Sequence, residues 1–411
     1  MSNGAVGKTN KINAFHVMAK PTGALCNLDC AYCFYMGKQE LIDSKSTMSD
    51  EVLERFIAQY ISSQNVQEIV FTWQGGEPTL LGIDFFERVV EFERLHCPPG
   101  KKIANDLQTN GTLIDEKWCE FLKEYNFLVG ISIDGPERLH NTYRVSRDGK
   151  PTFQRVFNAT KSLHRYGIDF NTLTVVNRVN AKHPAEVYRF LRDSVGSTRI
   201  QFIPLAEPKV FAKTPTSFIN ENDMPLLGSL ESLPGKPGSV VADWSVIPDD
   251  YGRFLNSVFD IWYRNDIGRV FVFLFECALA QWYGQQPSLC IFAETCGRAL
   301  AIEHDGSIYS CDHFVYPEHR LGNITQKHLG EMVNSVSQTV FGLSKSATLP
   351  EYCRKCEYLF ACYGECPKNR FIKSPDGEPY LNYLCSGLKK YFGHIDPYMK
   401  ELAELLRKQS R

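Results

Sequence analysis

The feature that most constrains this chain is the regular alternation, through its first half, of short apolar runs and helix-like stretches. Alternation of this kind is typical of βαβ units, in which helices connect neighbouring parallel strands. Six repeats predict an α/β fold built on a partial (β/α)6 TIM-like barrel. Strands are expected at 14–19, 68–73, 102–108, 127–133, 169–175 and 199–203, and helices at 50–62, 84–95, 115–125, 153–166 and 184–193.

Distinctive segments follow three of the expected strands. They read Gln-Gly-Gly-Glu-Pro at 74–78, Gln-Thr-Asn-Gly at 108–111 and Ser-Ile-Asp-Gly-Pro at 132–136. A single glycine pair would indicate only a tight turn, but several polar or glycine-rich strand ends in order indicate a functional edge. Because the chemistry of such barrels lies at the carboxyl ends of the strands, the sequence predicts the active site there.

The loop after the first expected strand carries Cys26, Cys30 and Cys33 at C-x3-C-x2-C spacing. Iron–sulfur clusters are usually held by four thiolates, and a metal site that lacks one protein ligand typically does chemistry. The spacing therefore predicts a four-iron cluster with one open iron, where a cofactor can bind.

Composition excludes several classes of protein. The chain has 45 basic and 47 acidic residues and no long basic block, so a nucleic-acid partner is not expected. The longest apolar run, 270–280, is interrupted by Glu276 and is shorter than the roughly 18 residues of a membrane span. With fourteen cysteines and no apolar N-terminal segment, we expect a cytoplasmic protein that uses thiols for metal or redox chemistry.

The C-terminal part begins with a Pro-, Gly- and Ser-rich stretch, 208–238, that is typical of a linker or long loop. A hairpin is then expected at 299–303 and 307–311. Eight cysteines could form two complete four-cysteine sites, and their spacing does not distinguish zinc from iron–sulfur. Three further cysteines fit no pattern and are expected to be small buried hydrophobes: Cys97, Cys119 and Cys277.

Taken together, CNLDCAYCFY, QGGEP, QTNG and SIDGP resemble the motifs of the radical S-adenosylmethionine (SAM) superfamily. The likeness is strongest to the anaerobic sulfatase-maturating enzymes, because His140 to Arg144 follow SIDGP at a matching distance and the C-terminal cysteines resemble a SPASM extension. We expect a radical SAM partial barrel at 1–235, a helical connection at 236–289, a SPASM domain with a β-hairpin and short helices at 290–395, and an amphipathic helix at 396–411.

The resemblance implies SAM and three [4Fe-4S] clusters as cofactors. The first cluster would be held by the three N-terminal cysteines. Two auxiliary clusters would be held by interleaved sets, which we call the first and second auxiliary sets. The first auxiliary set is Cys290, Cys296, Cys311 and Cys366, and the second is Cys353, Cys356, Cys362 and Cys385.

The resemblance to this family also implies four residues that contact SAM. Tyr32 stands where the family contacts the adenine, and Gly76 would admit the SAM amino group because glycine has no side chain. Ser132 would contact the ribose or methionyl part, and Arg144 would pair with the SAM carboxylate.

The implied reaction oxidises a cysteine or serine side chain in a Cys/Ser-x-Pro/Ala-x-Arg segment of an unfolded sulfatase polypeptide to formylglycine. A 5′-deoxyadenosyl radical takes a hydrogen atom from Cβ, Asp312 takes the thiol or hydroxyl proton as general base, and an auxiliary cluster takes the second electron. Tyr35 and Gln74 are expected to line the substrate pocket. A protein such as flavodoxin or ferredoxin would donate electrons.

Two other interpretations stay open. The nearer is another SPASM-type maturase that forms thioether or carbon–carbon crosslinks, although no peptide-recognition domain is evident before the first strand. The more distant is a non-catalytic zinc-binding regulator, which iron content would separate from an enzyme with about twelve irons per chain. One departure from the family pattern is Glu365, which replaces a glycine between Cys362 and Cys366 and would be strained at positive φ.

Overall fold

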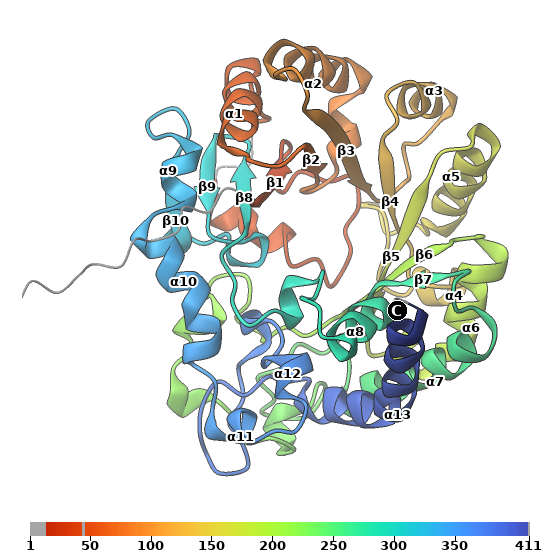
Figure 1. Cartoon of the computed structure of the whole chain (residues 1–411), viewed down its shortest axis with the longest axis vertical. Coiled ribbons are helices and arrows are strands. Elements are labelled where there is room, and N and C mark those ends of the chain that lie inside the picture. The colour runs from red at the N-terminus through yellow and green to blue at the C-terminus, as the bar shows by residue number, and fades with distance from the viewer. Residues whose placement is uncertain (1–13, 43–45, 410–411) are drawn as a thin grey trace, which may run out of the picture.

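A ten-stranded sheet organises the computed structural model, which describes residues 14–42 and 46–409 (Figure 1). The strand order is β10-β9-β8-β1-β2-β3-β4-β5-β6-β7, and β1 to β6 are parallel to one another. The partial barrel expected from the sequence is therefore confirmed. The strands are β1 His16–Lys20, β2 Glu68–Trp73, β3 Lys102–Thr109, β4 Leu128–Ser132, β5 Phe170–Val176, β6 Arg199–Pro204, β7 Phe271–Val272, β8 Ala299–Glu303, β9 Ser307–Tyr309 and β10 Arg320–Asn323.

Amphipathic helices cover the outer side of the curved strands, as Figure 1 shows for α1, α2, α3 and α5. Their starts follow local rules: Ser49 accepts a hydrogen bond from the Val52 amide at α1, and Asp115 accepts one from the Trp118 amide at α3. The helices of this half are α1 Asp50–Ser63, α2 Ile83–His96, α3 Glu116–Glu124, α4 Glu137–His140, α5 Phe153–Tyr166 and α6 Pro184–Arg189.

The cysteine-rich hairpin is part of the barrel sheet. Strand β8 pairs in parallel with β1, in a register that sets Glu303 beside Lys20. Strand β9 returns antiparallel to β8, and β10 is antiparallel to β9. The strand predicted at 307–311 ends at Tyr309, so Cys311 lies just beyond it. This pairing brings residues that lie far apart in the sequence together at the end of β1.

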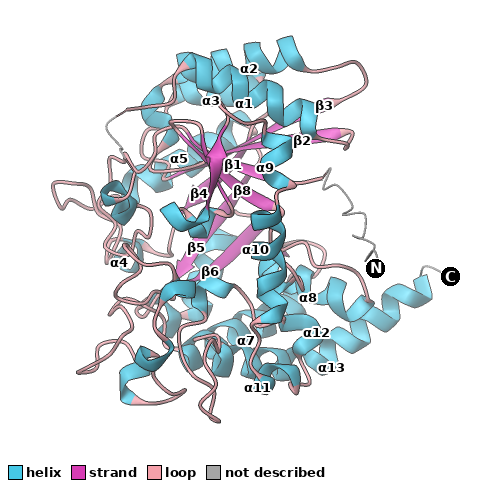
Figure 2. Cartoon of the chain, turned by 90° about the vertical axis from the view of Figure 1, so that its left-hand side faces the viewer, coloured by secondary structure: helices cyan, strands magenta, loops and turns pink. Residues whose placement is uncertain are grey.

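Of the remaining helices, α7, α8, α11, α12 and α13 gather below the sheet in Figure 2, whereas α9 lies beside the sheet and packs on α1. The prediction of a C-terminal helix at 396–411 is wrong about its start: α13 begins at Cys385 and continues through Pro397, and residues 410–411 lie outside the described part. It packs along α7, so closely that a Cβ on Gly387 would lie 1.9 Å from the Pro248 carbonyl oxygen. None of the helices in the described ranges is long and apolar enough to cross a membrane. The helices that follow α6 along the chain are α7 Pro248–Asn265, α8 Phe273–Tyr283, α9 Leu329–Val333, α10 Val336–Ala347, α11 Glu351–Arg354, α12 Leu359–Cys362 and α13 Cys385–Gln409.

Candidate active site

The loop with the first three cysteines is docked against the segment that follows β2. The Gly76 amide donates to the Gly23 carbonyl at 2.7 Å, and the Glu77 amide donates to the Leu25 carbonyl at 2.8 Å. A Cβ on Gly76 would lie only 1.9 Å from the Leu25 carbonyl oxygen, so no larger residue fits there without moving backbone. Gly76 is thus required by contact with the cysteine loop itself.

Glu77, to which the sequence analysis gave no role, joins two of the strand-end motifs. Its buried carboxylate accepts hydrogen bonds from both the amide and the hydroxyl of Thr79, at 3.1 and 2.6 Å, from the Thr109 hydroxyl at 2.6 Å and from the Asn110 amide at 2.7 Å. The Asn110 side-chain amide lies 3.7 Å from Cys26 Sγ. A Glu flanked by Gly and Pro at a strand end was the available signal for this role.

Tyr32, Asp134 and Arg144 form a buried polar cluster. The Tyr32 hydroxyl donates to Asp134 Oδ2 at 2.5 Å, and Arg144 Nη1 donates to the Tyr32 hydroxyl at 3.0 Å. Arg144 Nε has no hydrogen-bond acceptor among the described residues. A buried donor without an acceptor is costly, so the cluster offers a place for an anionic or polar ligand. Ser132 is half-buried at the end of β4.

The three N-terminal thiols are mutual neighbours. Burial raises the pKa of Cys26 and of Cys30 to about 11, and each of the three thiols has its pKa raised further by another of the three. All are therefore protonated in the metal-free site at neutral pH, and metal binding would release their protons.

Thiols within each of the two auxiliary sets raise one another's pKa. In the first set, burial raises the pKa of Cys311, and the thiols of Cys290 and Cys296 raise it further. The pKa of Cys366 is raised by burial, then by Glu365, and then by the thiols of the other three cysteines. The second set lines a pocket with about 420 Å³ of empty space, and all four of its cysteines contribute to that lining.

The donor set of each group fits an iron–sulfur cluster. No three of the His, Cys, Asp and Glu side chains in residues 14–42 and 46–409 are arranged to hold a single metal ion. A four-iron cluster is larger than an ion and is ligated by cysteine thiolates, which is the donor set present in each group. Of the three cysteines outside the groups, Cys119 and Cys277 are buried in the core and Cys97 is half-buried.

Asp312 lies directly after Cys311 and forms a buried ion pair with Lys20, the last residue of β1. The side chain of Lys20 is 1% exposed and that of Asp312 is 16% exposed. Burial alone would raise the pKa of Asp312, but the Lys20 ammonium, with smaller help from His313 and Lys38, holds it below its ordinary value. Asp312 is therefore a carboxylate, able to accept a proton. No sequence motif pointed to Lys20.

Tyr35 and Gln74 both meet Lys20. Lys20 Nζ donates to Gln74 Oε1 at 2.8 Å and lies 4.5 Å from the centre of the Tyr35 ring. The Tyr35 hydroxyl donates to the buried carboxylate of Glu303, the β8 residue in register with Lys20. The residues predicted to line the substrate pocket thus lie around the Lys20–Asp312 pair, and Tyr35 is also a buried core residue.

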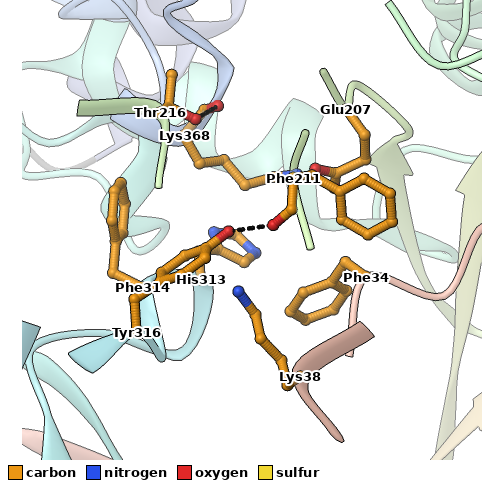
Figure 3. Close-up of a pocket in the computed structure, with 9 residues that line it drawn as sticks. All are labelled: Phe34, Lys38, Glu207, Phe211, Thr216, His313, Phe314, Tyr316 and Lys368. Atoms are coloured by element: carbon orange, nitrogen blue, oxygen red, sulfur yellow. Dashed lines mark hydrogen bonds and ion pairs between the residues drawn. The ribbon is translucent and has the colours of Figure 1, made fainter. Parts of the chain in front are cut away.

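A pocket with about 310 Å³ of empty space opens next to this pair (Figure 3). We call it the aromatic pocket, because rings from several segments face one another across it. His313 in its lining follows Asp312 directly, and its Nδ1 lies 3.5 Å from Cys366 Sγ of the first auxiliary set. The lining residues are Phe34, Lys38, Glu207, Phe211, Thr216, His313, Phe314, Tyr316 and Lys368.

Part of the wall comes from the stretch predicted to be a linker or long loop. Within it, Phe211 accepts a hydrogen bond through its carbonyl from the Tyr316 hydroxyl, and the Thr216 hydroxyl donates to the Lys368 carbonyl at 2.6 Å. Glu207, just before this stretch, forms an ion pair with Lys368. The stretch is therefore a packed loop that completes the pocket.

Lys38 enters the aromatic pocket from the opposite side to Lys368, as Figure 3 shows. Its side chain is almost fully buried, its Nζ lies 3.0 Å from the centre of the Tyr316 ring, and Nζ has no hydrogen-bond acceptor among the described residues. Burial lowers the pKa of Lys38 to about 7. The pocket thus combines apolar rings with a donor that lacks an acceptor.

Two family models match the chain. One describes the radical SAM superfamily and matches residues 21–191. The other describes an iron–sulfur cluster-binding domain, SPASM, and matches residues 290–357. The first covers the cysteine loop and the strand-end motifs, and the second begins at Cys290.

Whole-length relatives share both parts. The chain is 44% identical over 396 residues to a serine-type anaerobic sulfatase-maturating enzyme of Bacteroides thetaiotaomicron, covering 96% of this chain and 92% of that protein. It is 34% identical over 395 residues to a cysteine-type enzyme of Clostridium perfringens, covering 95% and 99%. The solved structure of native anSMEcpe with bound AdoMet and the Cp18Cys peptide matches with a TM-score of 0.80 at 34% identity, covering 95% of this chain and 99% of that one.

Proposed function

The chain belongs to the anaerobic sulfatase-maturating enzymes, radical SAM proteins with a SPASM domain, and from this premise we propose which residues carry its reaction. It oxidises a cysteine or serine side chain of a sulfatase to formylglycine. The observation that carries our assignment is the buried Asp312–Lys20 pair, which supplies a charged base inside the barrel.

The cysteines divide among three clusters in this proposal. Cys26, Cys30 and Cys33 hold the cluster that binds SAM, and the two auxiliary sets hold two further four-iron clusters. When bound, SAM and the clusters supply a 5′-deoxyadenosyl radical and accept an electron. The grouping of the eight C-terminal thiols supports the ligand sets.

The SAM-binding residues lie at the strand ends beside the cysteine loop. We assign Tyr32 to the adenine, Gly76 to the amino group, Ser132 to the ribose or methionyl part and Arg144 to the carboxylate. The Arg144 Nε without an acceptor supports this placement, because a SAM carboxylate would satisfy it.

Asp312 acts as the general base. It accepts the thiol or hydroxyl proton of the target residue once a hydrogen atom has left Cβ. Lys20 positions Asp312 and keeps it ionised, and Gln74 and Tyr35 fix Lys20 in turn.

The aromatic pocket holds the residues of the substrate next to the target. Its rings suit the proline or alanine of the Cys/Ser-x-Pro/Ala-x-Arg segment, since extended proline-containing peptides dock in aromatic-lined grooves. Lys38 donates to a carbonyl of that segment, which supplies the acceptor that Nζ lacks.

Fourteen cysteines without a disulfide fit a reducing compartment, and we place the reaction in the cytoplasm, before the sulfatase folds. A small carrier such as flavodoxin or ferredoxin supplies and removes electrons.

The test is anaerobic incubation of the reconstituted protein, SAM and a reductant with two synthetic peptides, one carrying Cys-x-Pro-x-Arg and one carrying Ser-x-Pro-x-Arg. Mass spectrometry should find the aldehyde at the target residue of at least one peptide, together with 5′-deoxyadenosine. Cleavage of SAM with both peptides unchanged would refute the substrate assignment and leave the radical chemistry standing.

A further inference from the structure

Lys345, on α10, is a buried cation that the proposed reaction does not use. It is fully buried, and its Nζ donates to the carbonyl oxygens of Cys290, Ile291 and Ala293 at 2.9, 2.7 and 2.5 Å. No carboxylate forms an ion pair with it within the ranges that the structure describes. A buried charge without a counter-charge is expensive, so a partner of opposite sign is expected close by.

The first auxiliary set provides that counter-charge. Lys345 Nζ bonds the carbonyl of Cys290 itself, and the Cys296 amide donates at 3.0 Å to the carbonyl of Gly342, which precedes Lys345 on α10. Cysteines that hold a cluster are thiolates. With a cluster bound, Lys345 would therefore lie beside negative charge, held there by its hydrogen bonds to the 290–293 turn. Reduction adds a further negative charge to such a site, and a neighbouring cation favours that step.

Glu365 is a buried charge of the opposite sign in the same region. It stands between Cys362 of the second auxiliary set and Cys366 of the first, and it is 3% exposed. Its carboxylate accepts hydrogen bonds from the side-chain amides of Asn369 and Asn382 at 2.8 and 2.7 Å. No cation pairs with that carboxylate anywhere in the described part of the chain. An anion held there opposes reduction of the clusters beside it.

The backbone of Glu365 adopts a conformation that residues other than glycine seldom adopt. Its φ is +49°, and Tyr363 and Gly364 before it also have positive φ. Glu365 therefore adopts the positive φ that glycine prefers. Arg370 stabilises the loop by donating to the carbonyls of Gly364 and Tyr363 at 3.0 and 2.8 Å, and it reaches the Lys345 carbonyl at 2.6 Å.

We propose that Lys345 and Glu365 are positioning charges that set, with opposite signs, how readily the auxiliary clusters accept the electron released by the substrate. The inference rests on the proposed cluster assignment. In the step concerned, the substrate radical, deprotonated by Asp312, loses one electron as its carbon–sulfur or carbon–oxygen double bond forms. An auxiliary cluster is reduced by that electron and is reoxidised by the electron-carrier protein.

The experiment is a redox titration followed by electron paramagnetic resonance, on full-length chains in which Cys26, Cys30 and Cys33 are alanine so that only the auxiliary clusters report. Lys345→Gln should lower the midpoint potential and Glu365→Gln should raise it. We expect each change to alter the one-electron reduction equilibrium about tenfold, which corresponds to about 59 mV. Lys345→Arg, which keeps the charge, should stay near the parent value.

Lys355→Gln is the matched control, because Lys355 directly precedes Cys356 but is 76% exposed, so solvent should screen its charge. Shifts of the same sign in Lys345→Gln and Glu365→Gln, or shifts no larger than that of the control, would overturn the proposal. If Lys345→Gln loses iron while Lys345→Arg keeps it, the charge is required and the proposal stands; loss of iron in both would overturn it. An unaltered protein without auxiliary iron would instead refute the cluster assignment.

Discussion

Replacing Lys20 by methionine tests the electrostatic part of this account most severely. Methionine keeps most of the length of the side chain, removes the ammonium and leaves Asp312 buried without its partner. Burial, which already tends to raise the pKa of Asp312, is then opposed only by the weaker effects of His313 and Lys38.

The expected magnitude follows from the burial of the pair. Removing one partner of a buried ion pair leaves an uncompensated charge that costs about 3–5 kcal/mol, and Asp312 can avoid most of that cost by binding a proton. One pKa unit corresponds to about 1.36 kcal/mol. In the unaltered enzyme the pKa of Asp312 lies below its ordinary value, so Asp312 stays ionised down to acidic pH and activity falls only there. In the variant the acidic limb of the activity profile should therefore move up by about 2 to 4 pH units.

The assay is kcat/KM for aldehyde formation across a range of pH, with 5′-deoxyadenosine measured in the same samples. Lys20→Arg keeps the positive charge and should retain the profile of the unaltered enzyme more closely. If Lys20→Met and the unaltered enzyme have superimposable acidic limbs, Lys20 does not control the ionisation of Asp312 and the reasoning is refuted.

Three further predictions concern the pocket, the cysteine loop and the second auxiliary set. Lys38→Met should raise KM for the peptide about tenfold with little change in SAM cleavage without peptide, because it removes one hydrogen bond to substrate; an unchanged KM would contradict the role given to Lys38. Gly76→Ala should weaken SAM binding and iron loading at the first cluster, since its methyl would displace the Leu25 carbonyl, and normal loading measured by iron analysis and spectroscopy would count against it. Cys385→Ala should lower the iron content from about twelve to about eight per chain, whereas Cys97→Ala should leave it unchanged.

Local sequence predicted the barrel well because the strands and helices of the first half are specified by their own periodicity, and α1 and α3 also by side-chain caps. The helix at 153–166 matches α5 residue for residue. The start of α13 was harder, since Pro397 favours the first turn of a helix, yet here the helix passes through it because its buried face packs along α7 and α8.

The association of the two halves was not predictable from local pattern. Nothing in Ala299–Glu303 indicates that it pairs with β1, because the pairing depends on sheet edges that exist only in the folded chain. Lys20 was missed for the same reason: a lysine at the end of a strand usually lies on the surface. Its partner Asp312 lies far away in sequence and is brought near by the hairpin.

The role of Asp312 as acceptor of the proton of the target side chain can be measured with Asp312→Asn and a peptide deuterated at Cβ of the target residue. The variant should still transfer deuterium into 5′-deoxyadenosine but form no aldehyde. Aldehyde formation by Asp312→Asn at the rate of the unaltered enzyme would show that Asp312 is not the proton acceptor.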